Sequence, residues 1–421
     1  MDSHLFDMHT DLDVKLVSAL KHFQYELDEE LKSILDFWKN NTIDTNGGFI
    51  GRIDENNVAD LSAPKGGVLN ARILWTFSAA YRKNRDIEDL ITAESAYRYL
   101  KNYMVDDVHG GIYWSVSSSG QPLDDKKQVY AIAFFIYGLS EYYLATGREE
   151  ALELAKAQYS LLIDKAFDQK ATGFYEAFAR DWTDIADLRL SAKDANEKKT
   201  MNTHLHVIEA FATLYRCWND EGLAGHIRLL LDNFETKIID RNSGHLILFL
   251  DEDWTAKSDV VSYGHDIEAG WLLLEAAEVL AEKKIIEQMK QISVDLTDAA
   301  TKGLNNDGSM SYEFEPESEH RIDEKHWWVQ AEAMVGYFNA FEITKDPSYL
   351  QKSLSVWEFV KNNIKDHKYG EWFWGVNEDG TLMGGQDKVG PWKCPYHNGR
   401  ACLELITRIE KVLSTDRSNI Q

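Results

Sequence analysis

Short glycine-containing segments that also hold aromatic or apolar residues recur six times along the chain. The comparable glycines are Gly48, Gly111, Gly173, Gly244, Gly308 and Gly370. By subtraction, their spacings are 63, 62, 71, 64 and 62 residues. A near-constant period indicates a supersecondary unit that is repeated along the chain. We therefore predict six similar units, each a short turn or β-ribbon followed by two helices.

Apolar residues at helical spacing predict a helix over residues 15–40, five helix pairs, and a last helix over 394–413. The pairs are 68–83 with 89–103, 126–146 with 149–164, 200–219 with 221–237, 263–281 with 283–300, and 326–344 with 347–363. The first helix of each pair is more apolar, which is typical of a buried helix, while the second is amphipathic. Six inner and six outer helices can close into an all-α (α/α)6 barrel, with the N-terminal helix beside the last inner one.

An open solenoid is the alternative arrangement, but a repeat count of six favours a closed ring. No linker or low-complexity segment interrupts the pattern. We therefore expect residues 1–421 to form a single barrel domain with short β-ribbons and loops at its rim.

The composition limits the partners of the chain. Its formal net charge is −25, so nucleic acid and anionic lipid would be repelled, and a neutral small molecule fits better. No run of 18 apolar residues exists, which argues against a membrane span. Three cysteines in 421 residues form no disulfide framework. The N-terminal residues lack the pattern of a signal peptide, so we expect a cytoplasmic protein.

Polar and aromatic residues gather at the starts of the six predicted inner helices. These starts carry Asn70 and Arg72; Gln128 and Tyr130; Asn202, His204 and His206; His265 and Glu268; Trp327, Trp328 and Glu332; and His397, Asn398 and Arg400. Helices that point the same way around a ring bring their starts to one rim. Convergent polar groups at one mouth indicate a binding or active site.

The predicted helix start at His265 carries two ionisable residues close together. His265 and Glu268 are three residues apart and share a helix face. A helix N-terminus disfavours positive charge, so a histidine there stays neutral and can act as a base. The alternative is an ordinary capped helix whose acidic first turn complements the helix dipole.

Two histidines lie two residues apart in the helix predicted over 200–219. His204 and His206 are about 200° apart around a helix, so only one of them faces the lumen. Asn202 shares the face of His206. We therefore expect His206 to be lumenal and His204 to be structural or to support the site from behind.

Two other chemistries are compatible with these residues. The three histidines with Glu268 could bind zinc, but no His-Glu-x-x-His motif is present, so we expect no metal. Glu268 and Glu332 could serve an inverting glycoside hydrolase, which would leave the histidines without a role. Histidines suit reversible proton transfer at carbon better. A sugar-binding protein without activity is the remaining alternative.

Tryptophans are frequent in the last third of the chain. Trp271 and Trp357 lie inside predicted helices, and we interpret them as core residues. Trp374 and Trp392 lie in loops beside the rim, where an aromatic face can stack on a sugar ring.

Four segments together resemble one known family. They are Asn202-Thr-His-Leu-His-Val-Ile-Glu-Ala210, Gly264-His-Asp-Ile-Glu-Ala-Gly-Trp271, His326-Trp-Trp-Val-Gln-Ala-Glu-Ala333 and Gly390-Pro-Trp-Lys-Cys-Pro-Tyr-His-Asn-Gly-Arg400. They resemble the cellobiose 2-epimerases of the N-acylglucosamine 2-epimerase superfamily, whose fold is an (α/α)6 barrel. The run Lys393-Cys-Pro-Tyr396 favours the disaccharide branch over N-acylglucosamine 2-epimerases. Aldose–ketose isomerases share the barrel and the histidines. Val329 stands where the epimerases often carry proline.

The resemblance implies epimerisation at C2 of the reducing-end sugar of cellobiose, lactose or mannobiose, without cofactor or metal. The ring opens, a histidine removes the C2 proton, and the cis-enediolate is reprotonated on the other face. His265 and His397 are then the acid–base pair, His206 assists ring opening, Glu268 orients or charges a histidine, and Arg72 stabilises the enediolate oxygen. Tyr130, Asn202, Trp327, Trp328, Trp374, Trp392 and Glu332 are expected to bind the sugar. The resemblance also implies a monomer.

Overall fold

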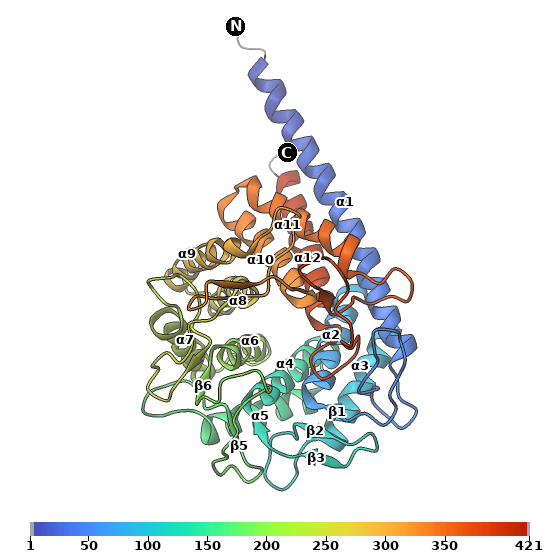
Figure 1. The fold of residues 1–421 in the computed structure, drawn as a ribbon, viewed down its shortest axis with the longest axis vertical. Helices are drawn as coiled ribbons and strands as arrows, with labels where there is room; N and C mark the ends of the chain where they lie inside the picture. Colours follow the sequence, from blue (N-terminus) through green and yellow to red (C-terminus); the bar gives the residue numbers. More distant parts are fainter. Residues whose placement is uncertain (1–3, 419–421) are drawn as a thin grey trace.

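The computed structural model describes residues 4–418, and its helices form two concentric layers (Figure 1). The inner helices are α2 (Gly67–Asn84), α4 (Val129–Thr146), α6 (Met201–Cys217), α8 (Tyr263–Leu280), α10 (Trp327–Thr344) and α12 (Tyr396–Ser418). The outer helices are α1 (His4–Asn41), α3 (Ile87–Tyr99), α5 (Glu149–Lys165), α7 (Glu221–Asn233), α9 (Lys283–Ala300) and α11 (Pro347–Phe359). Each inner helix contacts the next, and α12 contacts both α10 and α2. The ring is therefore closed, and the predicted (α/α)6 barrel is confirmed.

The two layers follow from the composition of the helices. Along α4, fifteen residues are buried, because nearly every position is apolar or small. Along α9, by contrast, only the face that includes Met289 and Leu296 is buried. The N-terminal helix α1 packs against α12, as expected for the outer partner of the last inner helix.

The six periodic glycines explain the turns between the layers. All six have positive φ, between 68° and 90°, a conformation that glycine adopts without strain. Space is a second constraint: a Cβ atom on Gly173 would lie 2.4 Å from the Trp254 ring. The predicted repeat therefore reflects a backbone turn that requires glycine.

Short strands connect neighbouring units at the rim. They are β1 (Lys65–Gly66), β2 (Ser115–Val116), β3 (Pro122–Asp124), β4 (Lys127–Gln128), β5 (Ala177–Phe178), β6 (Lys199–Thr200), β7 (Phe249–Leu250), β8 (Val261–Ser262), β9 (Glu313–Glu315), β10 (His320–Ile322), β11 (Lys325–His326) and β12 (Gly375–Val376). A two-residue strand directly before an inner helix pairs with a strand of the following unit, as β6 does with β7. This pairing fixes the height at which each of these inner helices begins.

Buried ion pairs reinforce the same positions. Lys65, Lys127 and Lys199 each lie two residues before an inner helix, and each pairs with an aspartate of the preceding turn. The Lys127–Asp106 distance is 2.8 Å. Because both partners are buried, removing one of them would leave an uncompensated charge. The rim that carries the helix starts is thus held rigidly.

The observed helix bounds differ from the predicted ones at a few ends. Helix α1 begins at residue 4 rather than 15. Three outer helices end in a five-residue π turn: Leu100–Met104, Phe234–Ile238 and Val360–Ile364. Residues 1–3 and 419–421 of the predicted domain lie outside the described residues. Across residues 4–418, no helix is long and apolar enough to cross a membrane.

Candidate active site

A cavity of about 760 Å³ opens at the rim and is lined by the starts of all six inner helices. The predicted site residues on its wall are Arg72, Tyr130, Asn202, His206, His265, Glu268, Trp327, Trp328, Trp374, Trp392 and His397. Only Glu332 of the predicted set does not line the cavity. Residues spread over more than 300 positions of sequence are therefore brought together, as the convergence of helix starts predicts.

His206 on α6 has its orientation fixed by a carboxylate on its own helix. Its Nδ1 lies 2.8 Å from Oε2 of Glu209, one helical turn further on. An ionised carboxylate can only accept a hydrogen bond, so Nδ1–H donates and Nε2 is left as an acceptor. Burial lowers the pKa of His206 despite the neighbouring Glu209. The ring is therefore a neutral base at physiological pH.

His204, in contrast, is fully buried and accepts a hydrogen bond from the backbone N–H of Phe174, which is a structural role.

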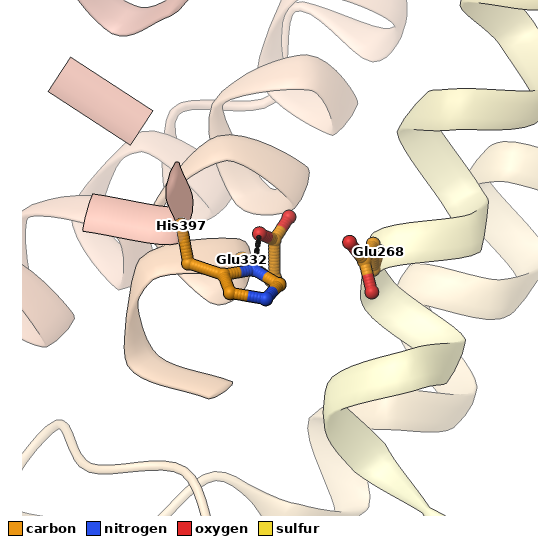
Figure 2. A group of neighbouring side chains, drawn as sticks. All are labelled: Glu268, Glu332 and His397. Atoms are coloured by element: carbon orange, nitrogen blue, oxygen red, sulfur yellow. Dashed lines mark hydrogen bonds and ion pairs between the residues drawn. The ribbon is translucent and has the colours of Figure 1, made fainter. Parts of the chain in front are cut away.

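His397 on α12 is oriented by a carboxylate from a different helix. Its Nδ1 lies 2.6 Å from Oε1 of Glu332 on α10, and Figure 2 shows this bond. Glu332 was expected to contact the sugar, but it lies behind the histidine and is 1% exposed. The reason is its position: five residues into α10, it is more than a turn below the rim. Burial, with Arg72 and Arg400 nearby, lowers the pKa of His397 well below its ordinary value.

His265 on α8 has a hydroxyl partner instead of a carboxylate. Its Nδ1 lies 2.8 Å from Oγ of Ser262. Although the ring partly faces the cavity, burial and the nearby His206 lower its pKa to about 3. The Trp328 ring lies beside both His265 and His397, with centroid distances of 4.7 and 5.8 Å. Two neutral histidines from different helices thus share one aromatic neighbour.

Polar groups without a protein partner point to a ligand. Arg72 donates to the Tyr130 hydroxyl at 2.7 Å, and its guanidinium lies 4.1 Å from the Phe134 ring centroid. Arg72 Nε and Asn202 Oδ1 are buried and have no hydrogen-bond partner within the described chain. Buried polar atoms are normally satisfied. Both residues line the cavity, so a bound molecule rich in hydroxyl groups is a candidate partner for them.

Aromatic side chains line the cavity on two sides. Trp392 lies 5.9 Å from Tyr130 and 5.8 Å from Trp114, measured between ring centroids. Trp374 packs against Trp327 at 4.4 Å, and Trp327 is nearly buried at 3% exposure. Trp328, Trp374 and Trp392 are partly exposed, so they have faces available for a ligand, whereas Trp327 mainly supports Trp374.

Arg400 organises the carboxylates below the histidines. Its Nη2 donates to Glu268 Oε1 at 2.7 Å and to Glu332 Oε1 at 2.6 Å, and its Nη1 donates to Glu209. We name these four residues the Arg400 cluster. Glu268 was expected to orient or charge a histidine, but its hydrogen bond is with Arg400, whereas Glu209 and Glu332 bond to the histidines.

One group in this region has metal-binding residue types. Ligand atoms of Glu268, Glu332 and His397 lie within 4.8 Å of one another (Figure 2). The Arg400 guanidinium, however, already bonds to both carboxylates. A divalent cation would have to lie beside this fixed positive charge, so the donor set fits an internal ion-pair cluster better than a metal.

Two further elements of the site, Glu209 and a loop around Ser191, lie outside the set of residues predicted from the sequence. Glu209 follows His206 by three residues, the same spacing as His265 and Glu268, and this signal was available. A loop around Ser191 and Asp194 also lines the cavity. It lies within the interval of 71 residues, the longest of the five, so the extra length marks an insertion over the site.

The fold and this site define a class of enzyme. The family model for N-acylglucosamine 2-epimerase matches residues 48–401. The chain belongs to that family and is a carbohydrate epimerase, an isomerase.

Its similar relatives specify the branch. Cellobiose 2-epimerase of Bacteroides fragilis is 48% identical over 90% of this chain and 98% of its own. Cellobiose 2-epimerase of Ruminococcus albus is 38% identical over 91% of this chain and 98% of its own. The solved structure of cellobiose 2-epimerase from Bacillus thermoamylovorans is 41% identical, with a TM-score of 0.89 over 92% of this chain and 100% of its own.

Proposed function

We propose that this enzyme interconverts glucose and mannose units at the reducing end of β-1,4-linked disaccharides, such as cellobiose, lactose and mannobiose. The observation that carries the proposal is the pair His265 and His397. Both line one cavity and lie beside Trp328, and burial lowers the pKa of both, which favours the uncharged imidazole. One histidine can remove a proton as a base, while the other, once protonated by water, returns a proton to the opposite face of the same carbon.

The steps follow from the side chains. His206, with Nε2 free, assists opening of the reducing-end ring to its aldehyde. One histidine of the pair removes the C2 proton, which the aldehyde acidifies, and a cis-enediolate forms. The C2–C3 bond rotates, and the other histidine, after taking up a proton from water, delivers it to the opposite face. The first histidine then releases its proton to water. Arg72 provides a fixed positive charge for the enediolate oxygen, which is the kind of electrostatic stabilisation that contributes most. No step requires a cofactor or metal.

The size of the site supports a disaccharide. Tyr130 and Asn202 are assigned to hydrogen bonds with the sugar, Trp328 to the reacting ring, and Trp392 with Trp374 to its neighbour. The cavity of about 760 Å³ falls in the range of sites that enclose drug-sized ligands.

The cellular setting is part of the proposal. We propose a cytoplasmic enzyme that acts as a monomer with one catalytic domain. Free Cys217, Cys394 and Cys402 support a reducing compartment. The net charge of −25 supports a monomer, because copies of the chain repel one another. A single continuous core supports one domain.

The test is the product formed from cellobiose, read by NMR. Glucosyl-mannose is the expected product. Glucosyl-fructose would indicate an isomerase and free glucose a hydrolase. Unchanged cellobiose with a saturable shift of tryptophan fluorescence would indicate binding alone.

A further inference from the structure

The Arg400 cluster contains more acidic groups than its bonded cation can balance. Glu209, Glu268 and Glu332 all hydrogen-bond to the one guanidinium of Arg400, and all four side chains are at most 3% exposed. Burial of an unbalanced charge is costly, and such a group usually takes up a proton instead. Arg72 is a further cation close to Glu268, but it donates to a tyrosine hydroxyl. Even counting Arg72, three ionised carboxylates would exceed two cations by one charge.

The number of donors around each carboxyl group identifies where a proton would reside. Glu209 receives hydrogen bonds from Arg400, Tyr396 and His206. Glu332 likewise receives three, from Arg400, Trp271 and His397.

Glu268 receives one, from Arg400. Hydrogen bonds to a carboxylate stabilise its charged form. The ionised form of Glu268 is therefore the least stabilised of the three. Glu268 is also the one carboxyl group of the cluster that lines the cavity, and Figure 2 shows it extending from α8 towards Glu332 and His397.

We propose that Glu268 is a neutral carboxylic acid in the resting enzyme and donates its O–H to an oxygen of the bound sugar. The identity of the sugar rests on the proposed function, whereas the protonation of Glu268 does not. No bond to carbon forms or breaks at Glu268; the proton stays on the carboxyl group and is shared in a hydrogen bond. Glu268 is thereby assigned a catalytic contact with the substrate in place of the histidine-orienting role.

The chemistry of the reaction gives this proton a function. The enediolate is negatively charged, and an ionised carboxylate on the same wall would repel it. A carboxylic acid removes that repulsion and adds a fixed donor where charge develops.

The electrostatic surroundings of Glu268 also favour its protonated form. Burial first, and then the charge of Glu332, raise the pKa of Glu268 well above its ordinary value. For Glu209, burial opposes ionisation, yet Arg400 and His206 hold the pKa at about 2. The titratable and charged groups that interact with Glu268 or line the same cavity are Arg72 on α2, Tyr130 on α4, His206 and Glu209 on α6, His265 on α8, Glu332 on α10, and Tyr396, His397 and Arg400 on α12.

Neutron diffraction from crystals of the deuterated enzyme at pH 7 tests the protonation directly. We expect nuclear density for a deuteron on the carboxyl group of Glu268, and none on Glu209 or Glu332. A deuteron on Glu332, or none in the cluster, overturns the proposal. This readout requires no turnover, so its failure is distinct from failure of the proposed function.

A matched pair of variants tests the contact with the sugar. Glu268→Gln is neutral and keeps an N–H donor, whereas Glu268→Met has similar length and none. We expect kcat to fall less than about tenfold in Glu268→Gln and about 10²–10³-fold in Glu268→Met. Glu268→Gln should also lose the decline in kcat/KM that deprotonation of Glu268 causes at alkaline pH. Equal losses in both variants, or an unchanged alkaline decline in Glu268→Gln, overturn the assignment of Glu268 as donor.

Discussion

The carboxylate behind His397 offers the sharpest test of how the acid–base pair is held. The change is Glu332→Gln, which keeps the volume of the side chain and removes its charge. In the unsubstituted enzyme, Glu332 accepts a hydrogen bond from Nδ1–H of His397 at 2.6 Å. Because Glu332 is only 1% exposed, water does not screen this interaction.

The magnitude follows from the kind of hydrogen bond that is lost. A bond to a charged group contributes about 1.5–3 kcal/mol and a neutral one about 0.5–1.5 kcal/mol. The difference of about 1–2 kcal/mol is realised when His397 becomes an imidazolium in the transition state. Since about 1.4 kcal/mol corresponds to a tenfold change in rate, kcat should fall roughly 5–30-fold. KM should change little, because Glu332 does not line the cavity.

The assay is initial-rate epimerisation of cellobiose, with Glu404→Gln as control. Glu404 lies on α12 and bonds to Arg408, and within residues 4–418 it has no hydrogen bond to a histidine, so this variant reports the general effect of losing a partly buried carboxylate. A kcat for Glu332→Gln within about twofold of the control would show that the charge of Glu332 does not assist His397.

Three further outcomes follow from the site. Trp392→Ala should reduce turnover of disaccharides more than turnover of free glucose, because binding of the remote ring contributes to holding the reactive end; equal losses in the two kinetic assays would place Trp392 at the reacting ring or in the scaffold. Activity should survive dialysis against a strong chelator, since the mechanism uses side-chain acids and bases; loss that added zinc or manganese restores would contradict this. Stability should fall on acidification: His265 has a pKa of about 3 in the folded chain and about 6.5 when unfolded. Between these values only the unfolded state binds the proton, so the free energy of unfolding falls as pH drops, by up to about 1.4 kcal/mol per pH unit for this group. Chemical denaturation should show a shallower pH slope for His265→Asn, and an unchanged slope would contradict the neutral state of His265.

Much of the fold could be predicted from the sequence because one backbone constraint repeats. Gly48 and its five counterparts all have positive φ. Each marks the same turn, so the spacing between them gives the length of the repeated unit. Helix ends were harder to predict. Apolar spacing continues through Leu100 and Phe234, so periodicity does not reveal that the outer helices change to π turns there.

The site was predicted in position but not in its internal bonding. Helix starts converge for geometric reasons, so the assembly of His206, His265 and His397 followed from the order of helices. The partner of His397 comes from α10, 65 residues earlier. Such pairings between helices depend on the rotation and height of each helix, which a single sequence does not specify.

In the proposed mechanism, two histidines move a proton at C2 through exchange with solvent. The most direct measurement is epimerisation of cellobiose in heavy water, followed by NMR of the product. We expect one deuterium at C2 of the new mannose unit. His265→Ala and His397→Ala should each lose epimerisation by on the order of 10²–10⁴-fold, while one of them retains exchange at C2 without inversion. Product formed in heavy water with hydrogen still at C2 would contradict the two-histidine account.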